Sequence, residues 1–370
     1  MDGFTVEFDQ AKVKTEYVDD YNVYLKRADG LLQAGEEVAY DQMVINDAEL
    51  PVFANVSGLP EYGQDGDLHV FYGDMAFEGS ANLRVSPWKA VFDASAGSLV
   101  SYVLGEKEMI KSPLAPCVAR AVIENDLGAK QDRRLELWRN AEFKVASFSV
   151  EATDFCYRVN VEYAPVGEAA VVSVVYDIYA DGTIAAKEAL ADAGKLSEAP
   201  MLPRFGMQMA MPGTFSVFEF FGLGPHENYI DRASSALVGH YVQNVNDQYH
   251  YGYARPQESG TKTRIKWMKV LDDNGAGFEI TSDMKFSASV LPFSWNEMDV
   301  RTMGTNQAHS LELKAKAHEN DRSYGRTWVN FDLVQQGLGC VNSWGAWPME
   351  QHLVKAQPYQ FNFVLRPVNN

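Results

Sequence analysis

The sequence predicts an all-β protein built around one large β-sandwich. Apolar residues recur at every second position in several stretches, which is the pattern of a strand with one buried face. The clearest example covers residues 155–163, where the alternating apolar residues are Phe155, Tyr157, Val159, Val161 and Tyr163. Helical periodicity is scarce, and the best candidate, DRRLELWRNA at residues 132–141, is short.

The predicted strands are separated by residues that favour turns. KAVFD at residues 89–93 and SLVSYVL at residues 98–104 are typical of a hairpin with Gly97 in its turn. AAVVSVVYDIYA at residues 169–180 is typical of a buried strand, and Asp181-Gly182 then supplies a tight turn. These signals predict antiparallel strands that follow one another closely.

The net charge of the chain limits which classes of molecule it is expected to bind. The 370 residues carry 32 Lys plus Arg against 50 Asp plus Glu, which gives a formal net charge of −18 at pH 7. An acidic surface repels phosphate backbones and anionic membranes, so we expect no nucleic acid and no membrane as partner, whereas a neutral sugar is compatible. No apolar stretch reaches the roughly 18 residues of a spanning helix, and MDGFTVEF has no feature of a signal peptide.

Cysteine and histidine spacing gives no sign of a metal site. Cys117, Cys156 and Cys340 are far apart and odd in number, which fits neither a disulfide framework nor a CxxC site. The seven histidines show no metal-ligand spacing. We therefore expect buried free thiols, no metal and no cofactor on this chain.

One short connection concentrates polar side chains. In FFGLGPHENYIDR, residues 220–232, two glycines and a proline follow a buried strand and force a sharp turn. The residues that follow can form a local hydrogen-bond network that fixes a corner, or His226 and Glu227 can act as an acid/base pair. We favour the corner, because no nucleophile signature lies nearby. The GxG is followed by proline, which excludes a dinucleotide fingerprint.

This connection belongs to a series of motifs that resembles the C-terminal domain of large bacterial β-galactosidases of glycoside hydrolase family 2. The family's pattern runs GxGPxExYxDR, then PQExG, then GxGGxxSWG. Here the motifs are GLGPHENYIDR, PQESG around Glu258, and GLGCVNSWG at residues 337–345, which we call the SWG segment. ARAVIENDLG at residues 119–128 is similar to the family's RAPxDNDxG. The resemblance covers nearly the whole chain.

The resemblance implies how the chain is divided. Residues 1–50 would be the last strands of an immunoglobulin-like β-sandwich, residues 51–66 a linker, and residues 67–370 a large galactose-mutarotase-like β-sandwich. The sequence itself also indicates a boundary, because INDAELPVFANVSGLPEYGQDG at residues 45–66 is rich in Pro, Gly, Asn and Asp.

The resemblance also implies an incomplete enzyme. The family's catalytic domain is a (β/α)₈ barrel that carries two glutamates, and this sequence has neither an alternating strand–helix pattern nor room for a barrel of roughly 250 residues. We therefore expect a non-catalytic C-terminal portion, inactive alone as a glycosidase, that acts with the barrel portion of the same enzyme or with a large subunit. The ligand would be a β-galactoside or another neutral sugar. The full enzyme would be a homo-oligomer, in either the cytoplasm or the periplasm.

One substrate contact is implied at Trp344. The SWG tryptophan of the family packs against the sugar at the mouth of the barrel, and an indole face offers a large apolar platform to a sugar. The alternative is an ordinary core tryptophan. Cys340 and Val341 stand where the family usually has Gly-Asp, which changes the approach to Trp344.

Further candidates lie in two other motifs. The residues that match the family's segment near a mobile loop of the active site are Asn125, Asp126 and Gly128. Gly128 is a candidate hinge, and Arg133 or Arg134 could reach the site; the alternative is a solvated turn. Glu258 in PQESG is another candidate polar contact, but we favour a structural role at a strand end for it.

Two other functions stay open. The mutarotase-like fold also hosts aldose epimerases that use a His base and a Glu acid, and His226 with Glu227 or Glu258 would be the candidates here. Fold alone does not decide function, and these residues lie in the galactosidase pattern. A carbohydrate-binding module would instead use exposed aromatic residues, of which the candidates are Trp295, Trp344 and Trp347.

Overall fold

The chain forms two compact units. The computed structural model describes residues 17–46, 50, 58–78, 83–299, 325–339, 341–342 and 345–369. The two units are Met1–Pro51 and Val52–Asn370. Their division falls beside residue 50, where the first domain is predicted to end.

The described part of Met1–Pro51 is one antiparallel hairpin. It consists of β1 (Tyr17–Tyr24) and β2 (Glu37–Asn46). Several of its apolar side chains are about half exposed within the chain, such as Val23 at 54% and Tyr24 at 55%. A two-stranded hairpin is marginally stable by itself. The immunoglobulin-like assignment of residues 1–50 stays a prediction, and the predicted strand FTVEF lies outside the described residues.

The described part of Val52–Asn370 is mostly antiparallel β-structure, which confirms the all-β class. Its strands are β3 (Glu61–Asp65), β4 (Leu68–Glu78), β5 (Leu83–Asp93), β6 (Ser98–Leu104), β7 (Lys107–Glu108), β8 (Ser112–Cys117), β9 (Val145–Ala152), β10 (Tyr157–Tyr163), β11 (Ala170–Ile178), β12 (Ile184–Asp192), β13 (Arg204–Met211), β14 (Val217–Gly224), β15 (Leu237–Asn244), β16 (Lys262–Leu271), β17 (Ala276–Leu291), β18 (Thr327–Gln335) and β19 (Tyr359–Asn369).

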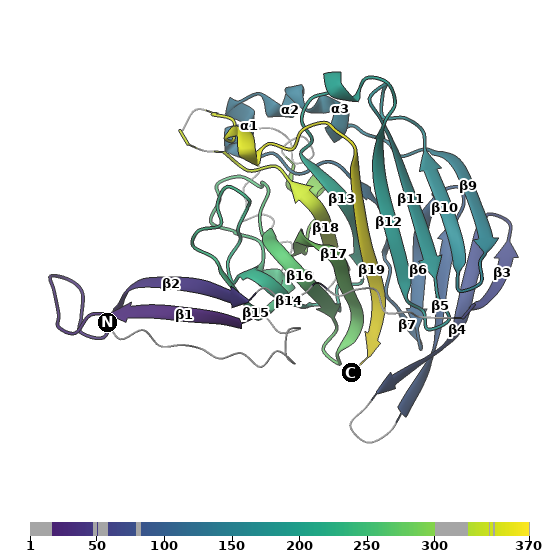
Figure 1. The fold of residues 1–370 in the computed structure, drawn as a ribbon, viewed down its shortest axis with the longest axis horizontal. Helices are drawn as coiled ribbons and strands as arrows, with labels where there is room; N and C mark the ends of the chain where they lie inside the picture. The colour runs from purple at the N-terminus through teal and green to yellow at the C-terminus, as the bar shows by residue number, and fades with distance from the viewer. Residues whose placement is uncertain are drawn as a thin grey trace. The chain divides into compact units, whose positions relative to one another are not determined.

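These strands form one continuous sheet that curls back on itself, so that two layers face each other (Figure 1). One layer runs β9-β10-β11-β12-β19, and the other runs β3-β4-β5-β6-β8-β13-β18. The long strand β17 joins the layers, because residues 276–282 pair with β19 and residues 287–291 pair with β18. From β17 the sheet continues through β16 and β14 to β15.

Side chains from the two layers meet in a shared core. Phe92 of β5 packs edge-on against Tyr176 of β11, with ring centroids 5.0 Å apart, and Tyr102 of β6 packs against Phe278 of β17 at 5.1 Å. Strand β11 alternates buried and half-buried residues along its whole length. The buried strand predicted around residues 169–180 is therefore confirmed.

The predicted turns are confirmed where glycine adopts a positive φ. Gly97 (φ 63°) lies between β5 and β6, and Gly182 (φ 79°) lies between β11 and β12. A Cβ at Gly182 would lie 2.4 Å from the hydroxyl of Tyr102. Both the backbone angle and the close packing therefore require glycine at this turn.

The segment predicted as a linker, residues 51–66, contains part of the sheet. Strand β3 occupies its second half, where Tyr62 packs against Phe71 with centroids 5.2 Å apart. Gly66 (φ 60°) then turns the chain into β4. The Gly- and Asp-rich residues at the end of this segment, which suggested a linker, thus form a hairpin turn between β3 and β4.

The helices are short. They are α1 (Glu124–Gly128), α2 (Gln131–Arg134), α3 (Glu136–Arg139), α4 (Trp295–Met298) and the 3₁₀ turns η2 (Leu196–Glu198), η3 (Val245–Asp247) and η4 (Glu350–His352). The helix predicted at residues 132–141 is two separate turns, because Leu135 leaves helical geometry (φ −101°, ψ 19°) and is buried. No described helix is long and apolar enough to cross a membrane. Figure 1 shows α1, α2 and α3 together at one end of the two layers, beside the yellow segment that leads into β19.

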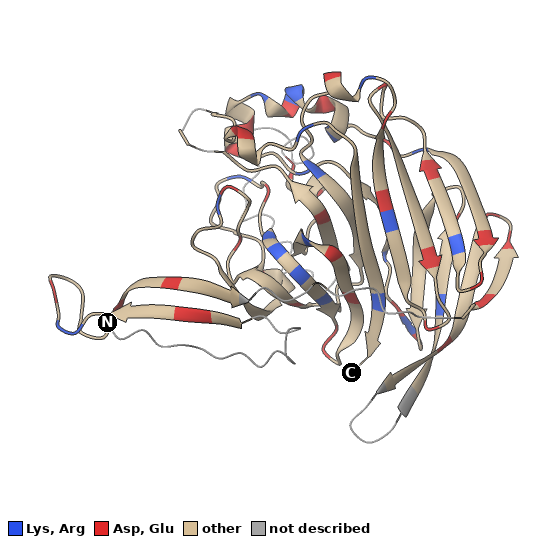
Figure 2. Cartoon of the chain, viewed as in Figure 1, with Lys and Arg blue, Asp and Glu red and all other residues tan. Residues whose placement is uncertain are grey.

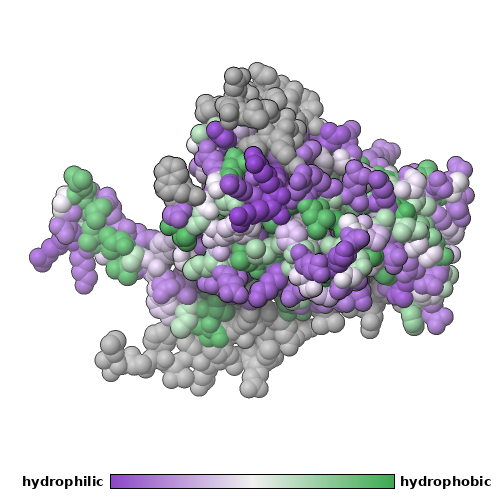
Figure 3. Space-filling model, turned by 90° about the horizontal axis from the view of Figure 1, so that it is seen from above, coloured by the Kyte–Doolittle hydropathy of each residue, from purple (hydrophilic) through white to green (hydrophobic). Residues whose placement is uncertain are grey.

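Charged residues of both signs are spread over the strands (Figure 2). Strand β16 carries several basic residues, yet Lys262 and Lys266 are buried and Lys269 lies 3.8 Å from Glu219. On the face seen in Figure 3, hydrophilic side chains dominate and hydrophobic ones are scattered between them.

Candidate functional site

The GPHENYIDR motif forms a fixed corner after β14. A cis Gly224–Pro225 peptide turns the chain. Asn228 is fully buried, and its amide donates to the backbone carbonyl of Leu223 (2.9 Å). Its side-chain oxygen accepts the backbone N–H of Thr263 (2.9 Å) and the Thr263 hydroxyl (2.6 Å). The structural interpretation of this motif is therefore confirmed.

The same corner holds the first residues of the SWG segment. The carboxylate of Asp231 accepts the backbone N–H of Leu338 (3.1 Å) and of Gly339 (2.7 Å). Gly337 lies so close to the Asp231 carboxylate that a Cβ at this position would be 2.6 Å from it. A side chain on the corner thus fixes the start of a segment that lies about a hundred residues away in the sequence.

The end of the SWG segment is held by α1. The Asn125 amide donates to the backbone carbonyl of Ala346 (2.8 Å), just after the end of the segment, and to that of Leu338 (3.3 Å), near its start. Gly345 (φ 83°) packs on the backbone of α1, where a Cβ would lie 2.2 Å from the carbonyl carbon of Gly128. Asn125 and Gly128 are therefore brought together with the segment that carries Trp344.

Asp126 stabilises α1 from inside the fold. It is 1% exposed, and its oxygens lie 2.6 and 3.2 Å from the two terminal nitrogens of Arg120. It also accepts the backbone N–H of Ile123 (2.9 Å). The carboxylate of Asp126 is therefore used by contacts within the protein, and its role in a ligand site at α1 would be to position Asn125. It does not face a ligand.

Trp344 itself lies outside the described residues, so its contact with substrate stays a prediction. Close to it in the sequence, Val341 is 68% exposed. Of the two candidate arginines, Arg134 lies over the ring of Trp347, at 5.7 Å from its centroid. The Arg133 side chain is 83% exposed and has Asp132 at 3.8 Å.

Glu258 lies in a buried network and not at the surface. It is 2% exposed, accepts the Gln335 amide (3.1 Å), and lies 3.4 Å from Arg204. Arg204 also faces Asp332 at 3.5 Å. Burial raises the pKa of Asp332 to about 7; Arg204 partly offsets this rise and Glu258 adds to it. A carboxyl group of raised pKa is typical of acid/base sites, but Asp332 is enclosed by the sheet and 0% exposed.

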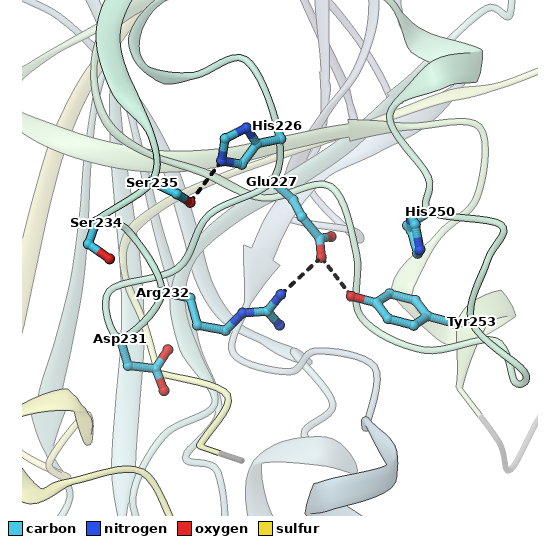
Figure 4. A pocket seen from close by; sticks show the side chains of 8 residues that line it. All are labelled: His226, Glu227, Asp231, Arg232, Ser234, Ser235, His250 and Tyr253. Carbon is cyan, nitrogen blue, oxygen red and sulfur yellow. Dashed lines mark hydrogen bonds and ion pairs between the residues drawn. The ribbon is translucent and has the colours of Figure 1, made fainter. Parts of the chain in front are cut away.

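His226 and Glu227 line a surface hollow of about 560 Å³ (Figure 4). Its lining residues are His226, Glu227, Asp231, Arg232, Ser234, Ser235, His250 and Tyr253. The Glu227 carboxylate accepts the Tyr253 hydroxyl (2.7 Å), the Gly260 N–H (2.9 Å) and the Ser259 hydroxyl (3.1 Å). His226 instead lies 3.0 Å from the Ser235 hydroxyl, and Figure 4 shows its ring directed away from Glu227. The two side chains share a hollow but are not hydrogen-bonded to each other.

Two further groups around this hollow have shifted pKa values. Burial and the neighbouring Glu227 charge raise the pKa of Tyr253 to about 12, so its hydroxyl remains a donor. The second is Lys262, which does not line the hollow: its amine donates to Gln248 (2.9 Å), and burial lowers its pKa to about 8, although the Glu227 charge opposes this shift.

The described residues contain no group of three or more His, Cys, Asp or Glu side chains that could hold a metal ion. Cys117 and Cys156 are free and buried, as expected. Burial raises the pKa of Cys117 to about 11, so it is a poor nucleophile. Cys340 lies outside the described residues.

Sequence reasoning did not single out Asp231 and Arg204, which organise this part of the structure. Each acts through partners that are distant in the chain, such as Leu338 for Asp231 and Gln335 for Arg204, which lies 131 residues away. The one local signal was the place of Asp231 within a polar corner motif.

Comparison with known protein families agrees with the resemblance that the sequence motifs indicate. The family described as "Beta galactosidase small chain" matches residues 84–365. The chain therefore belongs to the β-galactosidase small-chain family.

Curated relatives are β-galactosidases. The chain is 28% identical over 364 residues to the β-galactosidase of Priestia megaterium, which covers 98% of this chain and 32% of the relative. It is 27% identical to that of Halalkalibacterium halodurans, covering 95% of this chain and 33% of the relative. The chain thus spans about a third of the length of these relatives. Similar solved structures include a galactose mutarotase related enzyme from Lactobacillus acidophilus, with a TM-score of 0.40 and 8% identity over 80% of this chain and 97% of that one.

Proposed function

We propose that this chain is the non-catalytic, carbohydrate-facing C-terminal portion of a family 2 β-galactosidase. It would complete an active site whose catalytic barrel is supplied by the rest of the enzyme or by a large subunit. The observation that carries the proposal is the double anchoring of the SWG segment, by Asp231 near its start and by Asn125 both near its start and just after its end. Such anchoring suits a segment that must present a side chain to a site outside the domain.

The carboxyl groups support a non-catalytic role. A retaining glycosidase needs two carboxyl groups about 5 Å apart that face one sugar ring. Glu258 and Asp332, which share Arg204, are 2% and 0% exposed. A sugar cannot reach them without opening the sheet. Hydrolysis of a β-galactoside would therefore depend on carboxylates in the barrel, and the homo-oligomeric state belongs to the complete enzyme.

Trp344 is the residue that we propose to contact the sugar. Loss of its indole platform in Trp344→Ala should lower kcat/KM of the assembled enzyme by about ten- to a hundredfold, the equivalent of about 1.4–3 kcal/mol. The test mixes this variant with a barrel-bearing fragment and measures kcat and KM on a nitrophenyl β-galactoside. Trp267→Ala on β16 is the matched control. Unaltered kinetics in Trp344→Ala, or an unfolded protein, would support a core tryptophan instead.

The epimerase alternative has less support. An epimerase needs its acid and base free to exchange protons with one sugar. Glu227 already accepts three hydrogen bonds from protein donors, and His226 is paired with Ser235.

A further inference from the structure

We propose that the hollow around Arg232 is a binding site for a neutral sugar. It lies between the β14–β15 connection and the segment that precedes β16, and its eight lining residues come from these two stretches. Its volume of about 560 Å³ is within the range of small-ligand sites, roughly 300–1,000 Å³. This proposal does not depend on the galactosidase role, because it concerns binding by the chain alone.

The walls of the hollow are held in place before any ligand arrives. Glu227, on the β14–β15 connection, accepts hydrogen bonds from Tyr253, Ser259 and Gly260 on the other stretch. Beneath it, Asn228 joins the corner to Thr263 of β16. Because both walls are fixed to each other, little conformational entropy is lost on binding.

The charges of the hollow favour a neutral ligand. Arg232 is offset by Glu227, at 3.7 Å, and by the nearby Asp231, so an anion meets no net positive charge. Both carboxylates are already used as acceptors, Glu227 by three donors and Asp231 by the backbone amides of Leu338 and Gly339. A cation therefore finds no free carboxylate.

Polar groups remain that suit hydroxyls. The Arg232 side chain is 45% exposed and has five N–H donors, more than its contacts with Glu227 (3.7 Å) and the Tyr253 hydroxyl use, so donors remain for a ligand. Among the described residues, the side chains of His250 and Ser234 have no hydrogen-bond partner, and both line the hollow. The ring of Tyr253 adds an apolar face, which His250 flanks at 4.6 Å between centroids (Figure 4). Hydrogen-bonding groups beside an aromatic face suit the vicinal hydroxyls and C–H surfaces of a monosaccharide or disaccharide.

The test is calorimetric titration of the full chain with methyl β-galactoside, glucose and inorganic phosphate. We expect saturable binding of at least one sugar in the millimolar range and weaker or no binding of phosphate. Arg232→Ala and His250→Ala should each weaken sugar binding about tenfold, as expected for the loss of a hydrogen bond to a charged or polar group. Arg366→Ala, an exposed arginine on β19, is the matched control and should bind as the wild type does.

Three results would overturn the proposal. These are the absence of sugar binding up to tens of millimolar, equal sugar binding in all variants, or tighter binding of phosphate than of either sugar. His250→Ala keeps the test decisive if Arg232→Ala does not fold, because the His250 ring is exposed and makes no hydrogen bond among the described residues. A failure here leaves the galactosidase role untouched, because that role is measured by activity with a barrel fragment.

Discussion

Replacing Asp231 by Asn should loosen the start of the SWG segment without unfolding the sheet. The carboxylate accepts two backbone amides, at 3.1 Å from Leu338 and 2.7 Å from Gly339. An amide side chain has one acceptor oxygen toward this pair, and its NH₂ group would meet the second N–H. The change therefore removes one hydrogen bond to a charged group, which corresponds to about 2 kcal/mol or about a 30-fold change in an equilibrium.

The assay is amide hydrogen exchange at Leu338 and Gly339, followed by activity after mixing with a barrel-bearing fragment. We expect exchange at one of these amides to become about 30-fold faster, because local opening is then about 2 kcal/mol easier. The mixed enzyme should lose activity in parallel.

Asp192→Asn is the matched control. Asp192 also accepts two backbone amides, from Gly194 (2.6 Å) and Leu196 (3.0 Å), but in the turn after β12. Both amides donate to the same Asp192 oxygen, which an asparagine retains, so Asp192→Asn should change exchange at Gly194 and Leu196 little and should leave the mixed activity unchanged. Unaltered exchange at Leu338 and Gly339 in Asp231→Asn would refute the reasoning.

Three further changes test other parts of the structure. Glu188 is fully buried with no hydrogen-bond partner among the described residues, and burial holds its pKa well above the usual 4.5. Because the folded protein keeps this proton while the unfolded chain loses it, the stability of the wild type falls as pH rises above about 4.5. The urea midpoint of Glu188→Gln should therefore exceed that of the wild type by an increasing amount from about pH 5 to about pH 8. A difference that stays constant over this pH range would contradict the prediction. Gly345→Ala places a Cβ 2.2 Å from the backbone nitrogen of Ala129 and should lower the activity after mixing at least about tenfold. The control is Gly105→Ala, which is also at positive φ but in open space and should leave this activity unchanged. Normal kinetics in Gly345→Ala would argue against close packing of Gly345 on α1. Arg204→Met leaves two buried carboxyl groups without a counter-charge and should lower the free energy of unfolding by about 3–5 kcal/mol in urea titration, and a loss below about 1 kcal/mol would show that the network is not ionic.

The strands could be predicted because their signal is local. Burial along β11 alternates as the apolar and polar residues of its sequence do. Strand β3 was missed because it holds few apolar residues and depends on packing of Tyr62 against other strands. The break at Leu135 was also missed, since a short apolar pattern does not show where one helical turn ends and the next begins.

The candidate site could be predicted less completely. Asn125 was found through its motif, and the structure places it between Leu338 and Ala346. The motif did not reveal that Asp126 and Glu258 face inward, because their partners Arg120 and Arg204 are brought to them by the tertiary fold. A carboxylate has the same local sequence whether it points toward solvent or into a buried ion pair.

The central claim is tested most directly by hydrolysis of a nitrophenyl β-galactoside by the purified chain, alone and after mixing with a barrel-bearing fragment. The account predicts no turnover by the chain alone and restored activity on mixing. Turnover by the chain alone would mean that a carboxyl pair within this sheet, such as Glu258 and Asp332, is catalytic, and would contradict the proposed function.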